Sequence, residues 1–372
     1  MTIGILKEQA GENRVAVLPE SAAAFIKLNA QIAVEQGAGN NASTADADYT
    51  AAGAKVVSRD EILSQSDIVI SINGLEEADC GKLKNGAILV GQYLPLYNGA
   101  KMKTIAAKGI TLFSMDMLPR TTRGQAMDVL SSQANLAGYK AVVLAATHYP
   151  KLFPMLMTAA GTITPAKVMI IGAGVAGLQA IATAKRLGAQ VEAFDTRPAV
   201  KEECMSLGAK FIEVEGAADA SKAGGYAVEQ SAEFIARQKA KIHEHASKAD
   251  IIITTAQIPG RKAPLLVEKT TVDAMKPGSV IVDLAASTGG NCELTKDREI
   301  VIYNGVKIIG NSNLASDTAL DASKLYGKNL INFLKLIINK EGGINLNWED
   351  DLVKGTCITH DGNITNDKVV SA

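Results

Sequence analysis

The 372-residue chain has few of the features that mark membrane, secreted or nucleic-acid-binding proteins. It contains four cysteines, one tryptophan and 4% aromatic residues, and its formal net charge is −1. No segment approaches 18 consecutive apolar residues, which argues against a membrane-spanning helix. No basic run interleaves with aromatic residues, so nucleic acid is not expected as a partner. The first residues lack the charged-then-apolar order of a secretory signal, and we expect a cytoplasmic protein.

The cysteines and histidines form no metal-binding pattern. The cysteines are Cys80, Cys204, Cys292 and Cys357. They are widely separated, with no C-x-x-C and no histidine beside them, which indicates reduced structural thiols. His243 and His245 lie two residues apart in a polar, helix-like stretch, where such side chains point to different faces. We therefore predict no metal site.

Apolar strand-like runs alternate with helical stretches along the whole chain. This alternation is typical of parallel sheets with crossover helices, and the length suffices for two cores. The strand candidates in the first half are 2–6, 31–35, 55–57, 67–72, 87–91 and 110–114. Those in the second half are 168–171, 190–194, 210–214, 250–256, 279–285 and 306–310.

Two long helix candidates, 131–149 and 321–340, would connect the halves. In the second, apolar residues recur at helical spacing at Leu325, Leu330, Phe333, Leu334 and Ile337. We predict an α/β protein with two Rossmann-like, doubly wound parallel-sheet domains joined by these helices. The N-terminal domain is discontinuous and comprises 1–130 and 320–372, whereas the second comprises 131–319. The cleft between them is the expected binding site.

The stretch VMIIGAGVAGLQAIATAKRLGAQVEAFDTR, residues 168–197, has the order of a dinucleotide-binding fingerprint. A buried strand precedes Gly172, Gly174 and Gly177, and an amphipathic helix starts inside the glycine loop. Gly172 permits the tight turn, and Gly174 lets the backbone approach a pyrophosphate. Gly177 allows the helix to pack closely on its strand. N–H groups at the positive end of the helix would face the phosphates.

Asp195 follows the second strand at the position where the fingerprint has an acid that accepts from a ribose hydroxyl. Because an acid there disfavours a 2′-phosphate, we predict NAD(H) rather than NADP(H), although Arg197 would weaken this preference. The alternative is a glycine turn with a purely structural role. The complete order of strand, glycines, helix, second strand and acid favours the nucleotide site.

Two loops are further candidates for function. The segment 118–138 is polar and carries Arg120, Arg123, Gln125, Asp128, Ser131 and Ser132. Such groups suit a carboxamide, a ribose or a phosphate, but Asp128 is equally suited to cap a helix. The glycine-rich segment 220–231 fits either a mobile flap over an active site or an ordinary surface connection.

Several long motifs resemble the NAD(H)-binding domain I of proton-translocating nicotinamide nucleotide transhydrogenase. They are RTTRGQAMDVLSSQANLAGYKAV, TAAGTITPAKVMIIGAGVAGLQAIATAKRLGA, AFDTRPAVKEE, TTAQIPGRKAP and MKPGSVIVDLAASTGGNCE, and the resemblance covers nearly the whole chain. It implies that the chain binds NADH and passes its hydride to NADP⁺ held by a separate domain III. Membrane subunits would couple this step to proton movement. Alanine dehydrogenase is a related family with the same two-domain fold.

The resemblance also implies roles for individual residues. Arg120 and Ser131 would hold the nicotinamide carboxamide, whereas Gln125 and Asp128 would place the two nicotinamide rings against each other. The adenosine side falls on Gly172, Gly174, Val175, Ala176, Gly177, Asp195 and Arg197, the family's mobile loop on Gly225 and Tyr226, and the cleft lining on Thr255, Ala256 and Gln257. Gln257 stands where an aliphatic residue is expected.

Most groups that alanine dehydrogenase needs are missing. Its chemistry requires a proton donor and a cation for the substrate carboxylate. The resemblance places its substrate arginine on Arg14, but its lysine, histidine and aspartate positions hold Asn73, Pro95 and Ser287. We interpret Arg14 as part of an exposed structural salt bridge. Hydride exchange between two nicotinamide rings needs no proton donor, only proximity and orientation.

We therefore expect a Re/Si-specific NAD(P)⁺ transhydrogenase component that is active only with its partners. These partners are the NADP(H)-binding domain III and transmembrane subunits, which would hold it at the inner face of the membrane. The final NDKVVSA, with no apolar 20-mer, suggests a separate soluble α1 subunit. The family implies a homodimer, for which the apolar LINFLKLII offers a surface. The alternatives are an alanine-dehydrogenase-like oxidoreductase and a non-catalytic NAD(H) sensor.

Overall fold

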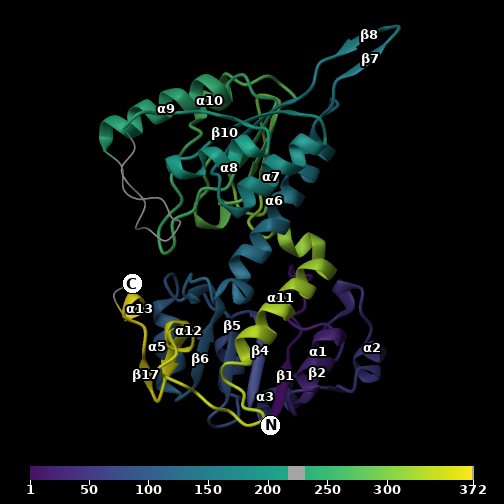
Figure 1. Cartoon of the computed structure of the whole chain (residues 1–372), viewed down its shortest axis with the longest axis vertical. Helices are drawn as coiled ribbons and strands as arrows, with labels where there is room; N and C mark the ends of the chain where they lie inside the picture. Colours follow the sequence, from purple (N-terminus) through teal and green to yellow (C-terminus); the bar gives the residue numbers. More distant parts are fainter. Residues whose placement is uncertain (217–230, 371–372) are drawn as a thin grey trace. The chain divides into compact units, whose positions relative to one another are not determined.

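A computed structural model divides the chain into two compact units, each built around a mainly parallel sheet (Figure 1). Unit 1 comprises Met1–Gln133 and Ser316–Ala372, and unit 2 comprises Ala134–Ala315. The structure describes residues 1–216 and 231–370. The predicted fold class, an α/β protein with two Rossmann-like units, is confirmed.

Unit 1 contains an eight-stranded sheet in the order β17-β16-β6-β5-β4-β1-β2-β3. Its strands are β1 (Thr2–Ile5), β2 (Gln31–Glu35), β3 (Lys55–Val57), β4 (Ile68–Asn73), β5 (Ile88–Gln92), β6 (Thr111–Ser114), β16 (Cys357–His360) and β17 (Asn363–Ile364). Its helices are α1 (Pro19–Ile26), α2 (Asp46–Ala51), α3 (Arg59–Gln65), α4 (Glu77–Cys80), α5 (Gly99–Ala107), α11 (Ala319–Leu334), α12 (Asp351–Thr356) and α13 (Asp367–Val370), with short 3₁₀ turns at Asn40–Ala42, Met115–Met117 and Gln125–Met127.

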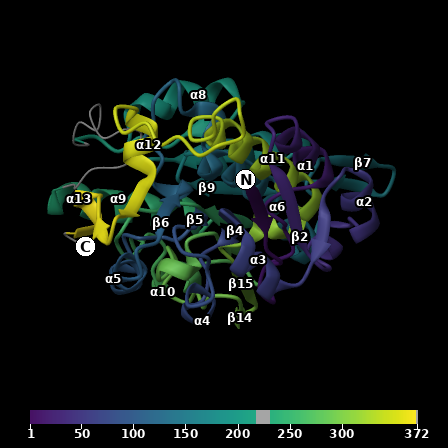
Figure 2. The same ribbon diagram turned by 90° about the horizontal axis from the view of Figure 1, so that it is seen from below.

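Helices cover both faces of this sheet. Ile70 of β4 packs in a cluster with Phe25 of α1 and Phe333 of α11, whereas Val69, the preceding residue on the strand's other face, joins a cluster with Ile62 of α3 and Met102 of α5. Figure 2 shows α1 and α11 on one side of the strands and α3 and α5 on the other. Burial on both faces explains why the strands are continuous apolar runs.

Helix α11 ends earlier than the predicted 321–340. Turns after Leu334 bring Ile337 and Ile338 into the same core as the helix. Leu330, Phe333, Leu334 and Ile337 have no exposed surface. Most of LINFLKLII is therefore buried in unit 1, so the prediction that this stretch offers a homodimer surface is wrong.

Unit 2 contains a seven-stranded sheet in the order β11-β10-β9-β12-β13-β15-β14 and a separate two-stranded hairpin, β7-β8. Its strands are β7 (Leu156–Thr158), β8 (Gly161–Ile163), β9 (Lys167–Ile171), β10 (Gln190–Phe194), β11 (Lys210–Phe211), β12 (Ile251–Thr254), β13 (Val280–Asp283), β14 (Ile300–Tyr303) and β15 (Val306–Gly310). Its helices are α7 (Val175–Arg186), α8 (Lys201–Ser206), α9 (Ala232–Ala246) and α10 (Lys269–Asp273), with 3₁₀ turns at Pro198–Val200 and Ala286–Thr288.

The long helix α6 (Val129–His148) begins in unit 1 and continues into unit 2, whereas α11 lies wholly in unit 1. Within unit 2, Ala141 of α6 and Ile181 of α7 pack on one face of the sheet with Ile170 of β9. Ile171 faces the opposite way, toward Ile242 of α9. Over the part of the chain that the structure describes, no helix is both long and apolar enough to cross a membrane.

Several strands at the sheet edges differ from the predictions. The predicted strand 210–214 is reduced to Lys210–Phe211, because the chain leaves the sheet after Ile212 donates one bond to Ala193. The antiparallel strands β14, β16 and β17 and the hairpin β7-β8 were not predicted. These short strands pair with neighbours that no local pattern identifies, so periodicity alone does not reveal them.

Candidate functional site

The glycine loop of unit 2 joins β9 to α7 and depends on two of its glycines for steric reasons. Gly172 has a φ of +100°, and a Cβ there would lie 2.6 Å from Thr255 Oγ1. A Cβ on Gly177 would lie 1.8 Å from the carbonyl oxygen of Gly172. Neither position accepts a side chain. A Cβ on Gly174 would meet no described atom within 4 Å, so this part of the loop faces open space.

Helix α7 presents its N-terminus at this open side. It begins at Val175 and Ala176, and within the described residues no side chain caps it. The first N–H groups of a helix have no partner inside it, and the helix dipole is positive there. A Cβ on Gly138 of α6 would lie 2.1 Å from the Ala176 carbonyl oxygen, so α6 packs closely against this turn. The arrangement suits a pyrophosphate.

Asp195 follows β10, the strand beside β9, and its carboxylate is bound to the glycine loop. Oδ2 accepts from the Ala173 N–H at 2.7 Å. Oδ1 accepts from the Arg197 N–H at 2.8 Å, and the guanidinium of Arg197 donates to both carboxylate oxygens at 2.9 and 2.8 Å. These hydrogen bonds raise the pKa of Arg197. The structure thus brings the acid to the loop, as predicted, and pairs it with Arg197.

The segment Thr255–Gln257 follows β12, on the other side of β9. Thr255 Oγ1 donates to the Gly172 carbonyl at 2.9 Å, and Gln257 Nε2 donates to the Leu284 carbonyl at 3.1 Å. Gln257 is exposed and tied to the loop after β13, a bond that an aliphatic residue cannot make. The segment and the glycine loop meet between β9 and β12, where the strand order reverses and ligands of open α/β sheets bind.

In unit 1, Asp128 caps helix α6 and binds Ser131. Its Oδ1 accepts from the Ser131 N–H at 2.9 Å, and its Oδ2 accepts from the Ser131 hydroxyl at 2.6 Å. The helix-cap interpretation is therefore confirmed in geometry, and it also joins two of the predicted site residues. Gln125 is exposed in the preceding 3₁₀ turn, and Arg120 is exposed before it.

Residues that the sequence analysis missed hold this polar segment in place. Asn329 of α11 donates to the Ala126 carbonyl at 2.9 Å and accepts from Ser132 Oγ at 2.7 Å. Arg123 pairs with Asp350 and Asp351 at the start of α12. Ser132 and Arg123 are thus engaged in fixing the segment. A polar residue on the buried face of the 321–340 helix was the one available signal for Asn329.

The predicted site residues belong to both units. Arg120, Gln125, Asp128 and Ser131 lie in unit 1, and the glycine loop, Asp195, Arg197 and Thr255–Gln257 lie in unit 2. Gly225 and Tyr226 lie outside the described residues. Unit 2 by itself assembles the glycines, the acid and the lining segment, while the cleft between domains stays a prediction.

Comparisons with known proteins match this two-part organisation. The family descriptions "Alanine dehydrogenase/PNT, N-terminal domain" and "Alanine dehydrogenase/PNT, C-terminal domain" match residues 4–137 and 141–367. The first part of the divided NAD(P) transhydrogenase subunit alpha of Rhodospirillum rubrum is 47% identical over 98% of both chains. This chain belongs to the NAD(P) transhydrogenase alpha-subunit family. Subunit alpha of Haemophilus influenzae is 46% identical over 97% of this chain and 71% of its own.

Solved structures extend the transhydrogenase relationship. The transhydrogenase from Sinorhizobium meliloti has a TM-score of 0.89 and 44% identity, and the match covers 98% of this chain and 100% of that chain. L-alanine dehydrogenase has a TM-score of 0.83 with 23% identity over 100% and 98% of the two chains, which shows the shared fold. The resemblance to the transhydrogenase family is confirmed, and alanine dehydrogenase is a more distant relative.

In this transhydrogenase-family chain, the position of the alanine dehydrogenase arginine is buried and its charge is neutralised. Arg14 Nη2 lies 2.7 Å from Glu12 Oε2, and its Nε and Nη1 donate to Glu12 and Gln133 at 2.8 Å each. The prediction of a salt bridge is confirmed, but the prediction that it is exposed is wrong. Burial would raise the pKa of Glu12, yet the Arg14 guanidinium holds it at about 2.

Asn73, which replaces the lysine of alanine dehydrogenase, completes this buried cluster. Its side-chain amide donates to Glu8 at 3.1 Å and to Glu12 at 3.3 Å. Glu8 also accepts from the backbone N–H groups of Ile72 and Asn73, while burial raises its pKa. A substrate carboxylate would have to displace Glu12 from Arg14, so the cluster does not suit keto-acid binding.

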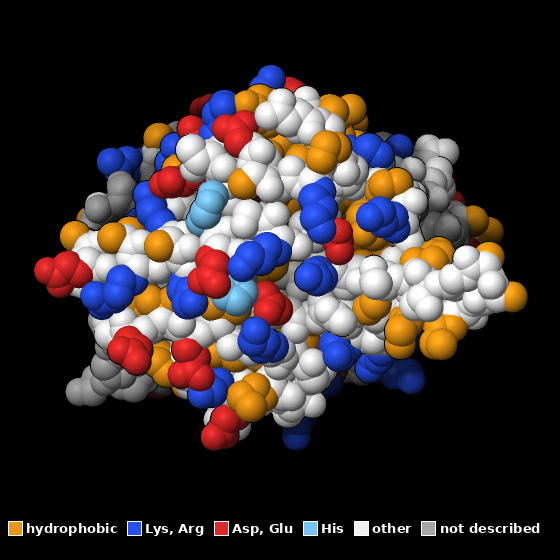
Figure 3. Space-filling model, turned by 90° about the horizontal axis from the view of Figure 1, so that it is seen from above, with side chains coloured by type: hydrophobic (Ala, Val, Ile, Leu, Met, Phe, Trp, Pro, Cys, Tyr) orange, Lys and Arg blue, Asp and Glu red, His pale blue; other side chains and the backbone are white. Residues whose placement is uncertain are grey.

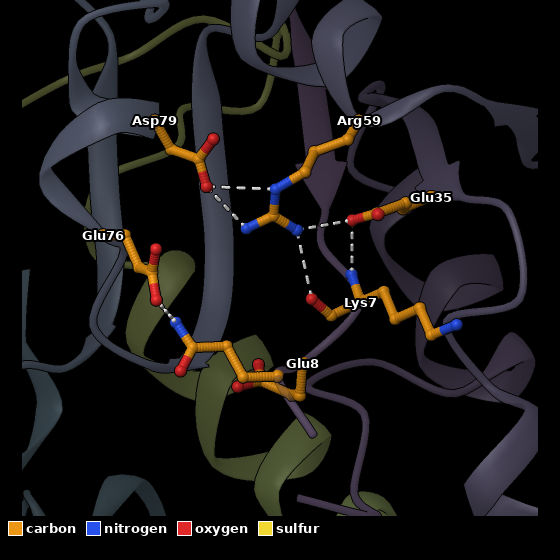
Figure 4. A pocket seen from close by; sticks show the side chains of 7 residues that line it. Lys7, Glu8, Glu35, Arg59, Glu76 and Asp79 are labelled. Carbon is orange, nitrogen blue, oxygen red and sulfur yellow. Dashed lines mark hydrogen bonds and ion pairs between the residues drawn. The ribbon is translucent and has the colours of Figure 1, made fainter.

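A polar pocket of about 240 Å³ opens near the ends of β1 and β2 in unit 1 (Figure 4). Arg59 lies in its wall and binds Glu35 at 2.8 Å and Asp79 at 2.8 Å. Gln9 donates to Glu76 at 3.0 Å. The charged groups of the wall are engaged with one another, and none of the predicted site residues lines this pocket.

Proposed function

We propose that the chain is the NAD(H)-binding component of a proton-translocating NAD(P) transhydrogenase. It would exchange hydride between NADH and NADP⁺, with the NADP(H) held by a partner domain and membrane subunits holding the complex at the inner face of the membrane. The observation that carries the proposal is the assembly of Gly172, Asp195 and Thr255 at the switch point of unit 2. This assembly occurs in a chain 47% identical to a transhydrogenase alpha subunit.

The residues of unit 2 fit a dinucleotide. The N–H groups at the start of α7 would donate to the pyrophosphate, and Gly174 leaves room for it. Asp195 would accept from a ribose hydroxyl. Because the Arg197 charge is balanced by Asp195, it offers little to a 2′-phosphate, which supports NAD(H) over NADP(H). When bound, NAD(H) supplies or accepts the hydride at its nicotinamide ring.

The polar segment of unit 1 would serve the nicotinamide end. Arg120 and Ser131 would bind the carboxamide, and Gln125 and Asp128 would orient the ring toward the second nicotinamide. The bond from the Ser131 hydroxyl to Asp128 fixes both side chains at the first turn of α6. Their contribution is orientation of the two rings, which needs no acid or base. Gly225 and Tyr226 would close over the nucleotide.

The test of this function is hydride transfer from NADPH to an oxidised NAD analogue. The purified chain is assayed alone and with the NADP(H)-binding domain of its source organism, and that domain is also assayed alone. We expect transfer only when both proteins are present. Demonstrated NADH binding without transfer would instead support a non-catalytic NAD(H) sensor.

Gln125→Ala is expected to slow hydride transfer by about 10- to 100-fold, because ring alignment is lost while the adenosine contacts remain. NADH affinity should stay within about twofold of the wild type, since a tenfold change needs ~1.4 kcal/mol. Thr122→Ala, an exposed change in the same segment, is the control and should alter neither quantity. Equal losses of rate and affinity in Gln125→Ala would contradict the orienting role.

We also propose that two copies of the chain associate through the hairpin β7-β8. Figure 1 shows the hairpin projecting from the rest of unit 2, and in Figure 3 hydrophobic side chains lie along the projection at the right edge. Met155, Leu156, Met157 and Ile163 are 59, 44, 74 and 42% exposed. An isolated two-stranded hairpin is marginally stable in water, and clustered exposed apolar residues mark association sites.

Met157→Lys is expected to convert the dimer into a monomer, because a charge would be buried in the interface. Light scattering during size-exclusion chromatography measures the mass directly. Ile302→Lys, at a 69% exposed position on the edge strand β14, is the matched control and should leave the mass unchanged. A Met157→Lys dimer would show that the copies meet elsewhere.

A further inference from the structure

Asn291 is a fully buried polar residue in the loop after β13, and its side chain clasps the segment that follows β12. Its Oδ1 accepts from the Ala256 N–H at 3.0 Å. Its Nδ2 donates to the Ala256 carbonyl at 2.9 Å and to the Pro264 carbonyl at 2.8 Å. One amide side chain thus satisfies both backbone polar groups of Ala256 and the carbonyl of a second residue.

The loop that carries Asn291 is itself anchored to the sheet by Asp283. This buried carboxylate, the last residue of β13, accepts from the N–H groups of Asn291 and Cys292 at 2.7 and 3.0 Å. It also accepts from Thr295 Oγ1 and the Ala285 N–H at 2.7 and 2.9 Å. The backbone of Asn291 therefore has one position, which its side chain transmits to Ala256.

The chain of contacts continues to the glycine loop. Ala256 follows Thr255, whose hydroxyl donates to the Gly172 carbonyl at 2.9 Å. Gly172 in turn determines the space available to Gly177 at the start of α7. The ends of three adjacent strands, β13, β12 and β9, are thus linked by side-chain hydrogen bonds through Asn291 and Thr255.

We propose that Asn291 is a positioning residue for the dinucleotide site, which holds Thr255–Gln257 at the distance from the glycine loop that the nucleotide requires. The inference rests on the proposed NAD(H) binding by unit 2. Without the amide, the N–H and carbonyl of Ala256 and the carbonyl of Pro264 would be left buried and unsatisfied. The segment would move to reach water. A shift of the lining backbone weakens the nucleotide contacts without touching the glycines or the acid.

The test compares Asn291→Ala with Thr295→Val by NAD⁺ titration calorimetry and thermal unfolding. Both changes remove hydrogen bonds from the same anchored loop, but only Asn291 reaches Ala256. We expect Asn291→Ala to bind NAD⁺ about 10-fold more weakly, equivalent to the loss of one or two hydrogen bonds. Thr295→Val should lose stability but keep its affinity within about twofold, because one hydrogen bond of Asp283 lies away from the lining segment.

Asn291→Asp is the second variant, used also if the alanine variant does not fold. It keeps the shape and the bond from the Ala256 N–H but turns a carboxylate toward two carbonyl oxygens, so NAD⁺ affinity should again fall. Wild-type affinity in either folded Asn291 variant, or an equal loss of affinity in Thr295→Val, would overturn the positioning role. Failure of the wild-type chain itself to bind NAD⁺ would overturn the proposed function and this inference together.

Discussion

Gly177→Ala is expected to weaken NADH binding by about 100-fold, a loss of ~2.7 kcal/mol. The new Cβ would lie 1.8 Å from the Gly172 carbonyl oxygen, a backbone atom that moves only if the glycine loop turns. Turning the loop redirects the N–H groups at the start of α7 and strains the bond from Thr255 to Gly172. Calorimetric titration with NADH measures the loss, and thermal unfolding should show an overpacking cost of about 1–3 kcal/mol.

Gly174→Ala is the informative comparison for this variant. Its Cβ would enter space free of described atoms, so the stability of unit 2 should not change. The same space is where the pyrophosphate would lie, so NADH affinity should fall. A variant at Gly177 that binds NADH as the wild type does would show that the nucleotide does not use this loop.

Arg14→Ala is expected to have the largest effect on stability, a loss of about 3–5 kcal/mol from the free energy of unfolding of unit 1. The guanidinium is buried against Glu12 and Gln133, and its removal leaves a carboxylate without its main counter-charge. Denaturant unfolding followed by circular dichroism measures the change. Glu8, whose pKa is raised by burial and by the charge of Glu12, lies in the same cluster and does not compensate.

The pH dependence of this loss has a definite sign. The pKa of Glu12 is about 2 in the folded chain, against an ordinary value of 4.5 for a solvated glutamate. A depressed carboxyl pKa stabilises the folded state above pH 4.5, and this stabilisation is lost as the pH falls toward 2. Arg14→Ala removes the cause of the depression. The difference in stability between wild type and variant should therefore be largest at neutral pH and shrink between pH 4.5 and pH 2.

Arg59→Ala is the matched control for Arg14→Ala. Arg59 also binds two groups, the carboxylates of Glu35 and Asp79, but its side chain is 30% exposed at the pocket of Figure 4. Solvent screens such pairs, and the expected loss is about 1 kcal/mol or less. Similar losses for both arginines would mean that the burial of Arg14 has no energetic consequence.

Local sequence patterns were sufficient where one segment makes its own interactions. The apolar run before Gly172 predicts β9 because a strand buried on both faces needs no alternation. The glycine spacing predicts the loop because the steric conflict of Gly177 is with Gly172, a near neighbour in the chain. Asp195 is found at the end of the next strand for the same reason, since parallel neighbours place their carboxyl ends together.

The same patterns failed where the partner is distant in the sequence. Ile300–Tyr303 is an apolar segment whose antiparallel pairing with β15 makes it an edge strand. Leu330 and Phe333 have the spacing of a helix with one apolar face, but spacing does not distinguish a core from an interface. Asn291 gave no signal because its partner, Ala256, lies 35 residues earlier.

The two α/β units, the glycine loop with its acid, and the resemblance to transhydrogenases were all accessible from the amino-acid sequence. These features follow from periodicity and from contacts between near neighbours in the chain. The burial of Arg14 against Glu12 and Gln133, the pairing of Arg197 with Asp195, and the hold of Asn291 on Ala256 became visible only in the folded chain. Burial and hydrogen-bond partners arise from how strands and helices pack, often across tens or hundreds of residues, and no local pattern encodes them.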